Sequence, residues 1–178
     1  VTIQSQPGLR IPNMFDAAIE GTFKAIFVQG EDIAQSDPNT IHVESALRSM
    51  ELVIVQDLFL NETARFAHVF LPGTSFLEKD GTFTNAERRI NRVRPAMRPR
   101  TGKHEWEVLC DVAKAMGGTM HYDHPSQIMD EIATLTPTFA GVSFERLDRE
   151  GSMQWPVNDA NPDGTPIMHI GKFVRGLG

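Results

Sequence analysis

Two short, uninterrupted apolar runs in the first third of the chain, residues 25–29 and 52–56, each end in polar or acidic residues. Apolar runs of this length are typical of strands that are buried on both faces of a parallel sheet. A segment long enough for a helix separates them, and a third apolar run follows at residues 69–71. This alternation predicts an α/β fold in which right-handed crossovers join parallel strands.

Cap and turn residues predict the helices between these strands. Three helices are expected before the polar middle of the chain, at residues 14–20, at residues 38–50, and from Asn61 or Thr63 to residue 66. Asp37 is expected to cap the second of them, and Pro38 to take its first position. The sequence therefore places one helical segment before each of the three strands.

The pattern changes after the third strand. Residues 78–89 are polar and rich in turn formers, and apolar and basic residues alternate from residue 90 to residue 94. Proline, arginine and glycine make residues 95–104 a loop. Further helices are predicted from residue 106 to Gly117, from Pro125 to Leu135 with an apolar stripe, and at residues 143–150.

Polar side chains follow the first two predicted strands, where open α/β sheets bind nucleotides. The first strand stops at Gly30 and is followed by Glu31, Asp32 and Ser36, whereas Gln56 and Asp57 close the second strand. Carboxylate and hydroxyl oxygens can accept hydrogen bonds from a base or a ribose. No GxGxxG fingerprint is present to hold a pyrophosphate. Alternatively, Asp32 and Ser36 satisfy backbone amides at a turn.

Basic residues beyond the third strand allow two interpretations. Lys79 could reach a ligand placed beside the first two strands, or it could belong to a solvated charge run at residues 78–80. If Arg88 and Arg89 are extended, their side chains point to opposite faces. One of them could then approach a phosphate, or the segment could be a solvated edge strand.

The composition excludes several classes of function. A formal net charge of −6 argues against a nucleic-acid partner, because such proteins neutralise phosphates with Lys and Arg. The single cysteine, Cys110, allows no internal disulfide or CxxC site, and its apolar helical stripe predicts a buried thiol. His121 and His124 lack further ligands at a recognisable spacing for a metal. No apolar run approaches the ~20 residues that cross a bilayer, so we expect a cytoplasmic protein.

Several motifs, in order along the chain, resemble the molybdopterin oxidoreductase family. They are QGEDIAQSDPN at residues 29–39, LVIVQD at 52–57, AHVFLP at 67–72, GTFTNAERR at 81–89 and HEW at 104–106. Four more, at residues 120–122, 137–141, 150–156 and 164–169, resemble the catalytic alpha subunit of formate dehydrogenases. The resemblance spans nearly all 178 residues.

The resemblance implies a fragment of a larger enzyme that oxidises formate to carbon dioxide. Members of the family hold molybdenum or tungsten between two pyranopterin guanine dinucleotides (bis-molybdopterin guanine dinucleotide) and carry a 4Fe-4S cluster. Residues 1–120 are similar to a Rossmann-like three-layer domain with a mostly parallel sheet, which grips the guanosine end of one dinucleotide. Residues 121–178 would form a helical and irregular C-terminal extension that leads to the next domain. The metal and cluster ligands have no counterpart here, so the isolated segment is expected to be inactive.

Position by position, the resemblance implies cofactor contacts on four loops, at Asp32, Ser36, Gln56, Asp57, Lys79 and Glu105. Gly30 and Glu31, from the polar segment after the first strand, complete the predicted cofactor site. Ser36 stands where a threonine is common, and Glu105 stands where an aspartate is typical. His104 is the alternative to Glu105 if the match shifts by one residue. The implied partners are other domains of the same polypeptide, and iron–sulfur or flavin electron-transfer subunits that use NAD.

Two alternatives stay open. The first is a structural relative without the metal cofactor, such as the large iron–sulfur subunit of respiratory complex I. The second is another reaction of the same family, such as nitrate reduction. The ends of the chain, which begins at Val1 without Met and closes on residues 171–178 in no recognisable element, are expected to be cuts through a longer polypeptide.

Overall fold

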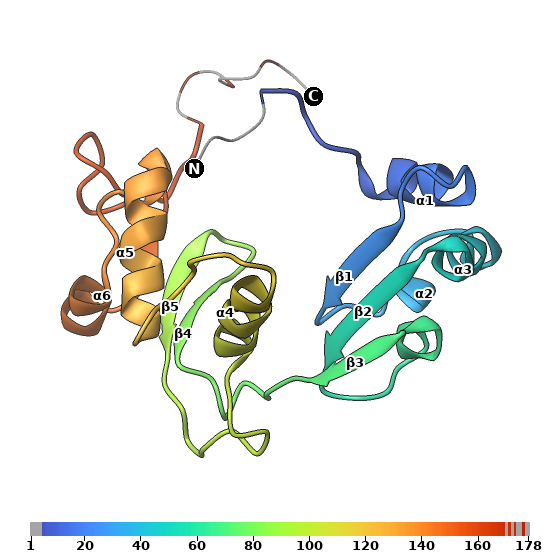
Figure 1. Cartoon of the computed structure of the whole chain (residues 1–178). Coiled ribbons are helices and arrows are strands. Elements are labelled where there is room, and N and C mark those ends of the chain that lie inside the picture. The colour runs from blue at the N-terminus through green and yellow to red at the C-terminus, as the bar shows by residue number, and fades with distance from the viewer. Residues whose placement is uncertain (1–4, 170, 172, 174–175, 177–178) are drawn as a thin grey trace. The chain divides into compact units, whose positions relative to one another are not determined.

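The computed structural model describes residues 5–169 together with residues 171, 173 and 176, so the predicted cut ends lie mostly outside the described residues. The chain divides into two compact units between Thr74 and Ser75. One three-stranded sheet is parallel and the other is antiparallel (Figure 1). The predicted α/β class with a parallel sheet is confirmed. The predicted division into residues 1–120 and 121–178 concerns the domains of a longer polypeptide and stays a prediction.

The first unit contains the parallel sheet, in the order β1-β2-β3. Its elements are α1 (Ile11–Ile19), β1 (Ala25–Gln29), α2 (Ile33–Ser36), α3 (Thr40–Ser49), β2 (Leu52–Asp57), the 3-10 helix η1 (Thr63–Phe66) and β3 (Val69–Pro72). The strands pair in register, with Val28 opposite Val55 and Val55 opposite Phe70. All three predicted strands are present, and the carboxyl ends of β1 and β2 lie at the same edge of the sheet.

The core of this unit lies between the sheet and helices α1 and α3. Val53 and Val55 of β2 are fully buried against Leu47 of α3 and Phe15 of α1. Their alternate positions on the strand place both side chains on the same face of the sheet. β1 differs from the prediction of burial on both faces, because Ala25 and Gln29 are exposed.

Helix α3 begins later than predicted. Asn39, not Asp37, caps it, in a left-handed conformation (φ 65°) with its side chain accepting a hydrogen bond from His42 N. Asp37 instead closes the short helix α2, which the sequence did not indicate, and its backbone is extended, as expected for a residue before proline. The chain therefore uses residues 37–39 to pass from one helix to the next.

The second unit contains the antiparallel sheet, in the order β4-β5-β6. Its elements are β4 (Gly81–Thr84), β5 (Arg89–Val93), α4 (Glu105–Ala115), α5 (Pro125–Leu135), the 3-10 helix η2 (Pro137–Phe139), α6 (Phe144–Glu150) and β6 (Met153–Gln154). Its buried cluster includes Ile90 of β5, Met129 of α5, and Phe144 and Leu147 of α6. The predicted helices at 125–135 and 143–150 are present. β5 lies where apolar and basic residues alternate, whereas β4 was predicted only as part of a polar, turn-rich segment.

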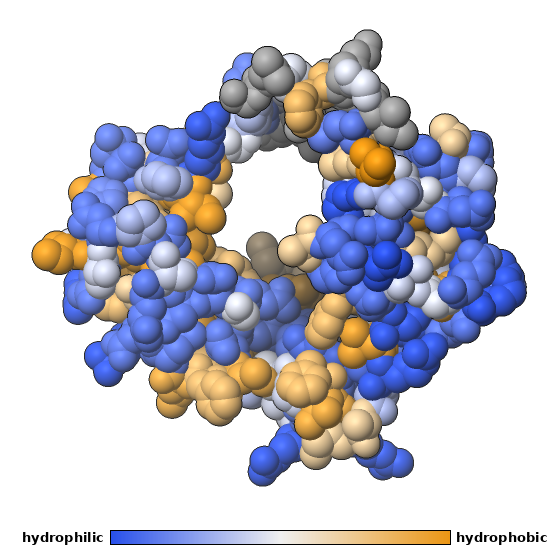
Figure 2. Space-filling model, turned by 180° about the vertical axis from the view of Figure 1, so that it is seen from behind, coloured by the Kyte–Doolittle hydropathy of each residue, from blue (hydrophilic) through white to orange (hydrophobic). Residues whose placement is uncertain are grey.

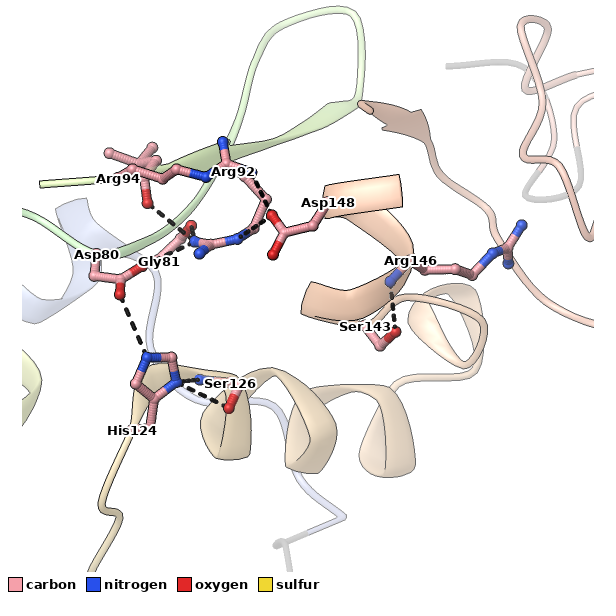
Figure 3. A network of polar contacts seen from close by, with 10 residues as sticks. Asp80, Gly81, Arg92, Arg94, His124, Ser126, Ser143, Arg146 and Asp148 are labelled. Atoms are coloured by element: carbon pink, nitrogen blue, oxygen red, sulfur yellow. Dashed lines mark hydrogen bonds and ion pairs between the residues drawn. The ribbon is translucent and has the colours of Figure 1, made fainter. Parts of the chain in front are cut away.

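A network of polar contacts joins the hairpin to α5 and α6 (Figure 3). The guanidinium of Arg92 pairs with Asp80 at 2.9 Å and with Asp148 at 3.1 Å, and it lies 3.8 Å from the centroid of the Phe144 ring. His124, at the start of α5, approaches the same Asp80 carboxylate at 3.4 Å. Arg92 is therefore occupied in holding together the elements of this unit.

Two expectations about burial in this unit are wrong. Cys110 is half-buried, and α4 contains no fully buried residue. On α5 the buried residue is Met129, whereas Ile132 and Leu135 of the predicted apolar stripe are 37% and 66% exposed. An apolar stripe shows which face a helix can bury, but the number of neighbouring elements decides how much of that face is covered.

Candidate functional site

The predicted ligand loops of the first unit meet at the carboxyl edge of its sheet. Gln29 and Gln56 are register partners on β1 and β2, and Gly30 N donates a hydrogen bond of 2.9 Å to the carbonyl oxygen of Gln56. Gly30 has a φ of 64°, a conformation that glycine adopts without the steric cost that a side chain adds. This turn directs the chain from the end of β1 towards α2.

Asp32 stabilises this edge of the sheet through hydrogen bonds to neighbouring residues. Its Oδ1 accepts hydrogen bonds from Thr63 N at 2.9 Å and from Thr63 Oγ1 at 2.6 Å, and its Oδ2 accepts one from Gln35 at 2.8 Å. Desolvation raises the pKa of Asp32, but the hydrogen bonds from Thr63, Glu62 and Gln35 outweigh it and hold the pKa below its ordinary value of 3.8. Asp32 is therefore an ionised link between α2 and η1.

Thr63 was predicted only as a possible helix start and not as a part of this site. Its side chain is fully buried, and its Oγ1 also accepts a hydrogen bond from Ala34 N at 3.0 Å. A threonine beside an expected acidic loop is a weak signal in a sequence, because only the fold brings positions 32 and 63 together.

The other acidic and hydroxyl side chains of this edge pair locally. Ser36 Oγ donates to Glu31 Oε1 at 2.6 Å, on the exposed side of α2. Asp57 accepts hydrogen bonds from Leu58 N at 2.6 Å and from Asn61 Nδ2 at 3.1 Å, which close the loop after β2. The alternative that Asp32 and Ser36 satisfy only backbone amides is too simple, because Ser36 bonds a side chain and Asp32 bonds both kinds of donor.

Gln56 differs from all of these residues. It is 1% exposed, and within the described part of the chain neither its Nε2 nor its Oε1 has a hydrogen-bond partner. Buried amides are almost always paired, because an unmade hydrogen bond costs the full desolvation of the group. An amide can donate and accept at once, which suits a heterocyclic base or a ribose. Of the predicted site residues in this unit, Gln56 carries the unused hydrogen-bonding capacity.

Two predicted site residues belong to the second unit and contact each other. Lys79 Nζ lies 3.0 Å from Glu105 Oε1, and the side chain of Glu105 is only 14% exposed. The interpretation of Lys79 as part of a purely solvated charge run is therefore wrong. The pair links the segment after β3 to the first turn of α4.

Arg88 and Arg89 are engaged within the second unit. Arg88 has a φ of 68°, and its guanidinium donates to the carbonyl oxygens of Trp155, Thr165 and Pro166. Arg89 contacts Glu87 and Ser152. These contacts leave the guanidinium of Arg88 occupied by the C-terminal segment, not directed to a phosphate. Among the described residues, no three His, Cys, Asp or Glu side chains gather as a metal site would require.

Comparisons with known proteins identify the family. Residues 2–115 match the family model of the molybdopterin oxidoreductases. The chain is 43% identical to a putative formate dehydrogenase of Staphylococcus haemolyticus and 40% identical to a probable oxidoreductase of Bacillus subtilis, over 97% of its length in both cases. It is 44% identical over 96% of its length to the F420-dependent formate dehydrogenase 1 subunit alpha of Methanococcus maripaludis. The chain belongs to the molybdopterin oxidoreductase family.

The chain spans only a part of these relatives. It covers 18% of the Staphylococcus and Bacillus proteins and 26% of the Methanococcus subunit. Acetylene hydratase from Pelobacter acetylenicus has a similar structure, with a TM-score of 0.62 and 21% identity over 80% of this chain and 20% of that one. At this identity the likeness shows the fold alone. In the described part of the chain, no helix is long and apolar enough to span a membrane.

Proposed function

We propose that this chain is the part of a formate dehydrogenase alpha subunit that binds the guanosine end of a bis-molybdopterin guanine dinucleotide holding molybdenum or tungsten. The buried and unpaired amide of Gln56 carries the proposal, because it stands at the strand edge where α/β sheets bind nucleotides. The relatives named formate dehydrogenase support formate over nitrate as the substrate of the whole enzyme. When bound, the cofactor supplies the redox chemistry that converts formate to carbon dioxide.

In this proposal, some residues of the site contact the nucleotide and others hold the loops of the site in place. Gln56 donates to and accepts from the nucleotide, and Gly30 gives close access at the turn. Asp32, Ser36 and Asp57 hold the loops in place through the contacts described above, and Glu31 offers an exposed carboxylate. Lys79 and Glu105 act as a pair, in which the lysine holds the half-buried carboxylate in place.

The second part of the proposal concerns the other domains and subunits that this segment contacts. Hydrophobic residues are exposed at several places on the surface (Figure 2). Phe59 and Leu60 are 75% and 78% exposed. Exposed apolar patches mark interaction surfaces. They support packing of the chain against other domains of a longer cytoplasmic polypeptide. Iron–sulfur and flavin subunits that deliver electrons to NAD, and a 4Fe-4S cluster outside this segment, complete the proposed enzyme.

A substitution at Gln56 separates binding from folding. Gln56→Leu removes the unpaired amide, so the free energy of unfolding stays unchanged or rises by about 1–3 kcal/mol. The same change lowers the affinity for GMP roughly tenfold, because the hydrogen bonds to the nucleotide are lost. Affinity is measured by titrating the chain with GMP while recording a heteronuclear NMR map, and stability by urea unfolding.

Gln6→Leu makes the same chemical change at an exposed position outside the site and is expected to alter neither quantity. We expect weak GMP binding even in the unaltered chain, because a shared site leaves part of its contacts on other domains. If GMP changed the NMR chemical shifts of other residues but not those of the loops at Asp32, Gln56 and Lys79, the site would be misassigned. A large loss of stability in Gln56→Leu would mean that the amide has a structural partner.

A further inference from the structure

An unbroken basic segment runs through the middle of this acidic chain. Residues 88–103 contain seven of its 17 Lys and Arg residues and no Asp or Glu, although the chain as a whole has a net charge of −6. Like charges close together in a folded protein repel one another, and nearby carboxylates or a bound anion reduce that repulsion. The contacts of the seven side chains therefore show whether the segment is satisfied internally.

Six of the seven basic residues have partners within the second unit. The partners are carbonyl oxygens for Arg88, Glu87 for Arg89, Asp80 and Asp148 for Arg92, Asp148 for Arg94 and Asp111 for Lys103. Arg100 donates its backbone N–H to Glu78, and its guanidinium interacts with the same carboxylate electrostatically, without a hydrogen bond or a close ion pair among the described residues. Arg98 is the exception. In the part of the chain that the structure describes, its guanidinium has no hydrogen bond, ion pair or ring contact, and the residue is exposed.

Arg98 lines a hollow of about 360 Å³ in the second unit. The other lining residues are Pro95, Ala96, Met97, Pro99 and His104. His104 contributes a second unsatisfied group, since its Nδ1 is buried and has no hydrogen-bond partner among the described residues. Its ring stacks on Trp106 with an interplanar angle of 10°, which limits its rotation. The free guanidinium of Arg98 and the ring of His104 thus line one small hollow.

The electrostatics of the hollow favour an anion. The acidic residues nearest in sequence are all engaged: Glu78 accepts from the backbone N–H of Arg100 at 2.7 Å, Glu105 pairs with Lys79, and Glu107 accepts from His104 N at 2.7 Å. None of the three lines the hollow. The planar fork of an arginine matches the oxygens of a phosphate, and a phosphate group accepts from an imidazole N–H as well.

We propose that Arg98 and His104 bind the phosphate group of a small molecule in this hollow. The volume of the hollow lies within the range of small-molecule pockets and is larger than a single phosphate group. The hollow can therefore also hold part of the molecule to which the phosphate is attached. Two sources share this chemistry: a phosphate of the guanine dinucleotide, and a separate phosphate-bearing molecule. The proposal stands on the basic segment and the hollow, independently of formate as the substrate.

Inorganic phosphate is the probe, titrated by calorimetry at low salt into the full-length protein from which any bound dinucleotide has been removed. Arg98→Gln is expected to lower the affinity roughly tenfold or more, because a hydrogen bond to a charged group contributes about 1.5–3 kcal/mol. His104→Phe keeps the stacked ring, removes the nitrogen, and is expected to weaken binding by about threefold to tenfold. Arg149→Gln makes the same charge change on α6, where Arg149 pairs with Glu150, and is expected to leave the affinity unchanged.

A second measurement identifies the source of the phosphate. GMP released by acid hydrolysis reports how much dinucleotide the full-length protein holds. A lower GMP content in Arg98→Gln assigns the phosphate to the dinucleotide, whereas an unchanged content assigns it to a separate ligand. The proposal is overturned if phosphate does not bind, or if Arg149→Gln weakens binding as much as Arg98→Gln, which would indicate bulk electrostatics. Absence of GMP in the unaltered protein would instead contradict the proposed function.

Discussion

At the scale of single residues, the chemistry of a side chain did not reveal how it is used. Asp32 looked like a ligand because a carboxylate follows a strand end, but its oxygens are occupied by Thr63 and Gln35. Gln56 gave the weaker signal in the sequence, yet its buried amide has no hydrogen-bond partner among the described residues. The difference lies in the partners, which come from distant positions in the chain.

Removing the carboxylate of Asp32 tests this bracing role. Asp32→Ala leaves the buried Thr63 hydroxyl and the amide N–H of Thr63 without their acceptor, so the free energy of unfolding is expected to fall by about 1–3 kcal/mol. Asp37→Ala removes a nearby acidic side chain that has no hydrogen-bond partner among the described residues. This control is expected to change the free energy of unfolding by less than about 0.5 kcal/mol. Urea unfolding of both variants measures the difference. Equal changes in the free energy of unfolding of the two variants would show that the hydrogen bonds of Asp32 do not stabilise the fold.

At the scale of elements, local patterns located most strands and helices, whereas connections and pairings needed the fold. Strands β1 to β3 are present where the apolar runs predicted them, because burial of such runs is favourable wherever the sheet forms. Strand β4 has a polar, glycine-containing sequence and was missed. Its pairing with β5 gives it a strand conformation that its composition does not favour.

The carboxylate of Glu78 links Ser75 to Arg100, so this link depends on pH. The backbone N–H of Arg100, followed by the N–H and hydroxyl of Ser75, donates to Glu78 and lowers its pKa below the ordinary value of 4.5. A lowered pKa contributes stability that is fully present above about pH 4.5 and is lost as the pH falls through the folded-state pKa. Stability is therefore expected to fall on acidification from pH 5 to pH 3.

Glu78→Gln removes the titrating group, so its loss of stability over the same pH range is expected to be smaller than that of the unaltered chain. Chemical denaturation at pH 5, 4 and 3 measures both. Glu145→Gln changes an exposed carboxylate of α6 and serves as the control. If Glu78→Gln and the unaltered chain lost the same stability between pH 5 and pH 3, groups other than Glu78 would cause the loss.

At the scale of the whole molecule, the chain is a family member that spans about a fifth of most of its relatives. If it belongs to a formate dehydrogenase, the full open reading frame encodes a metal-binding cysteine or selenocysteine followed by histidine, upstream of this segment. Sequencing that reading frame checks this expectation. Absence of the pair would favour the cofactor-free alternative that resembles the large subunit of complex I.

The sequence by itself determined the α/β class, the three parallel strands, the loops that follow them and the family, because these depend on local apolar periodicity and on motifs contiguous in the chain. The tertiary structure decided which polar groups are satisfied: it joined Asp32 to Thr63 and Lys79 to Glu105, and among the described residues it left the side chains of Gln56 and Arg98 without partners. Hydrogen bonds and ion pairs act over a few ångströms in space, so residues 31 positions apart become partners only once the chain has folded.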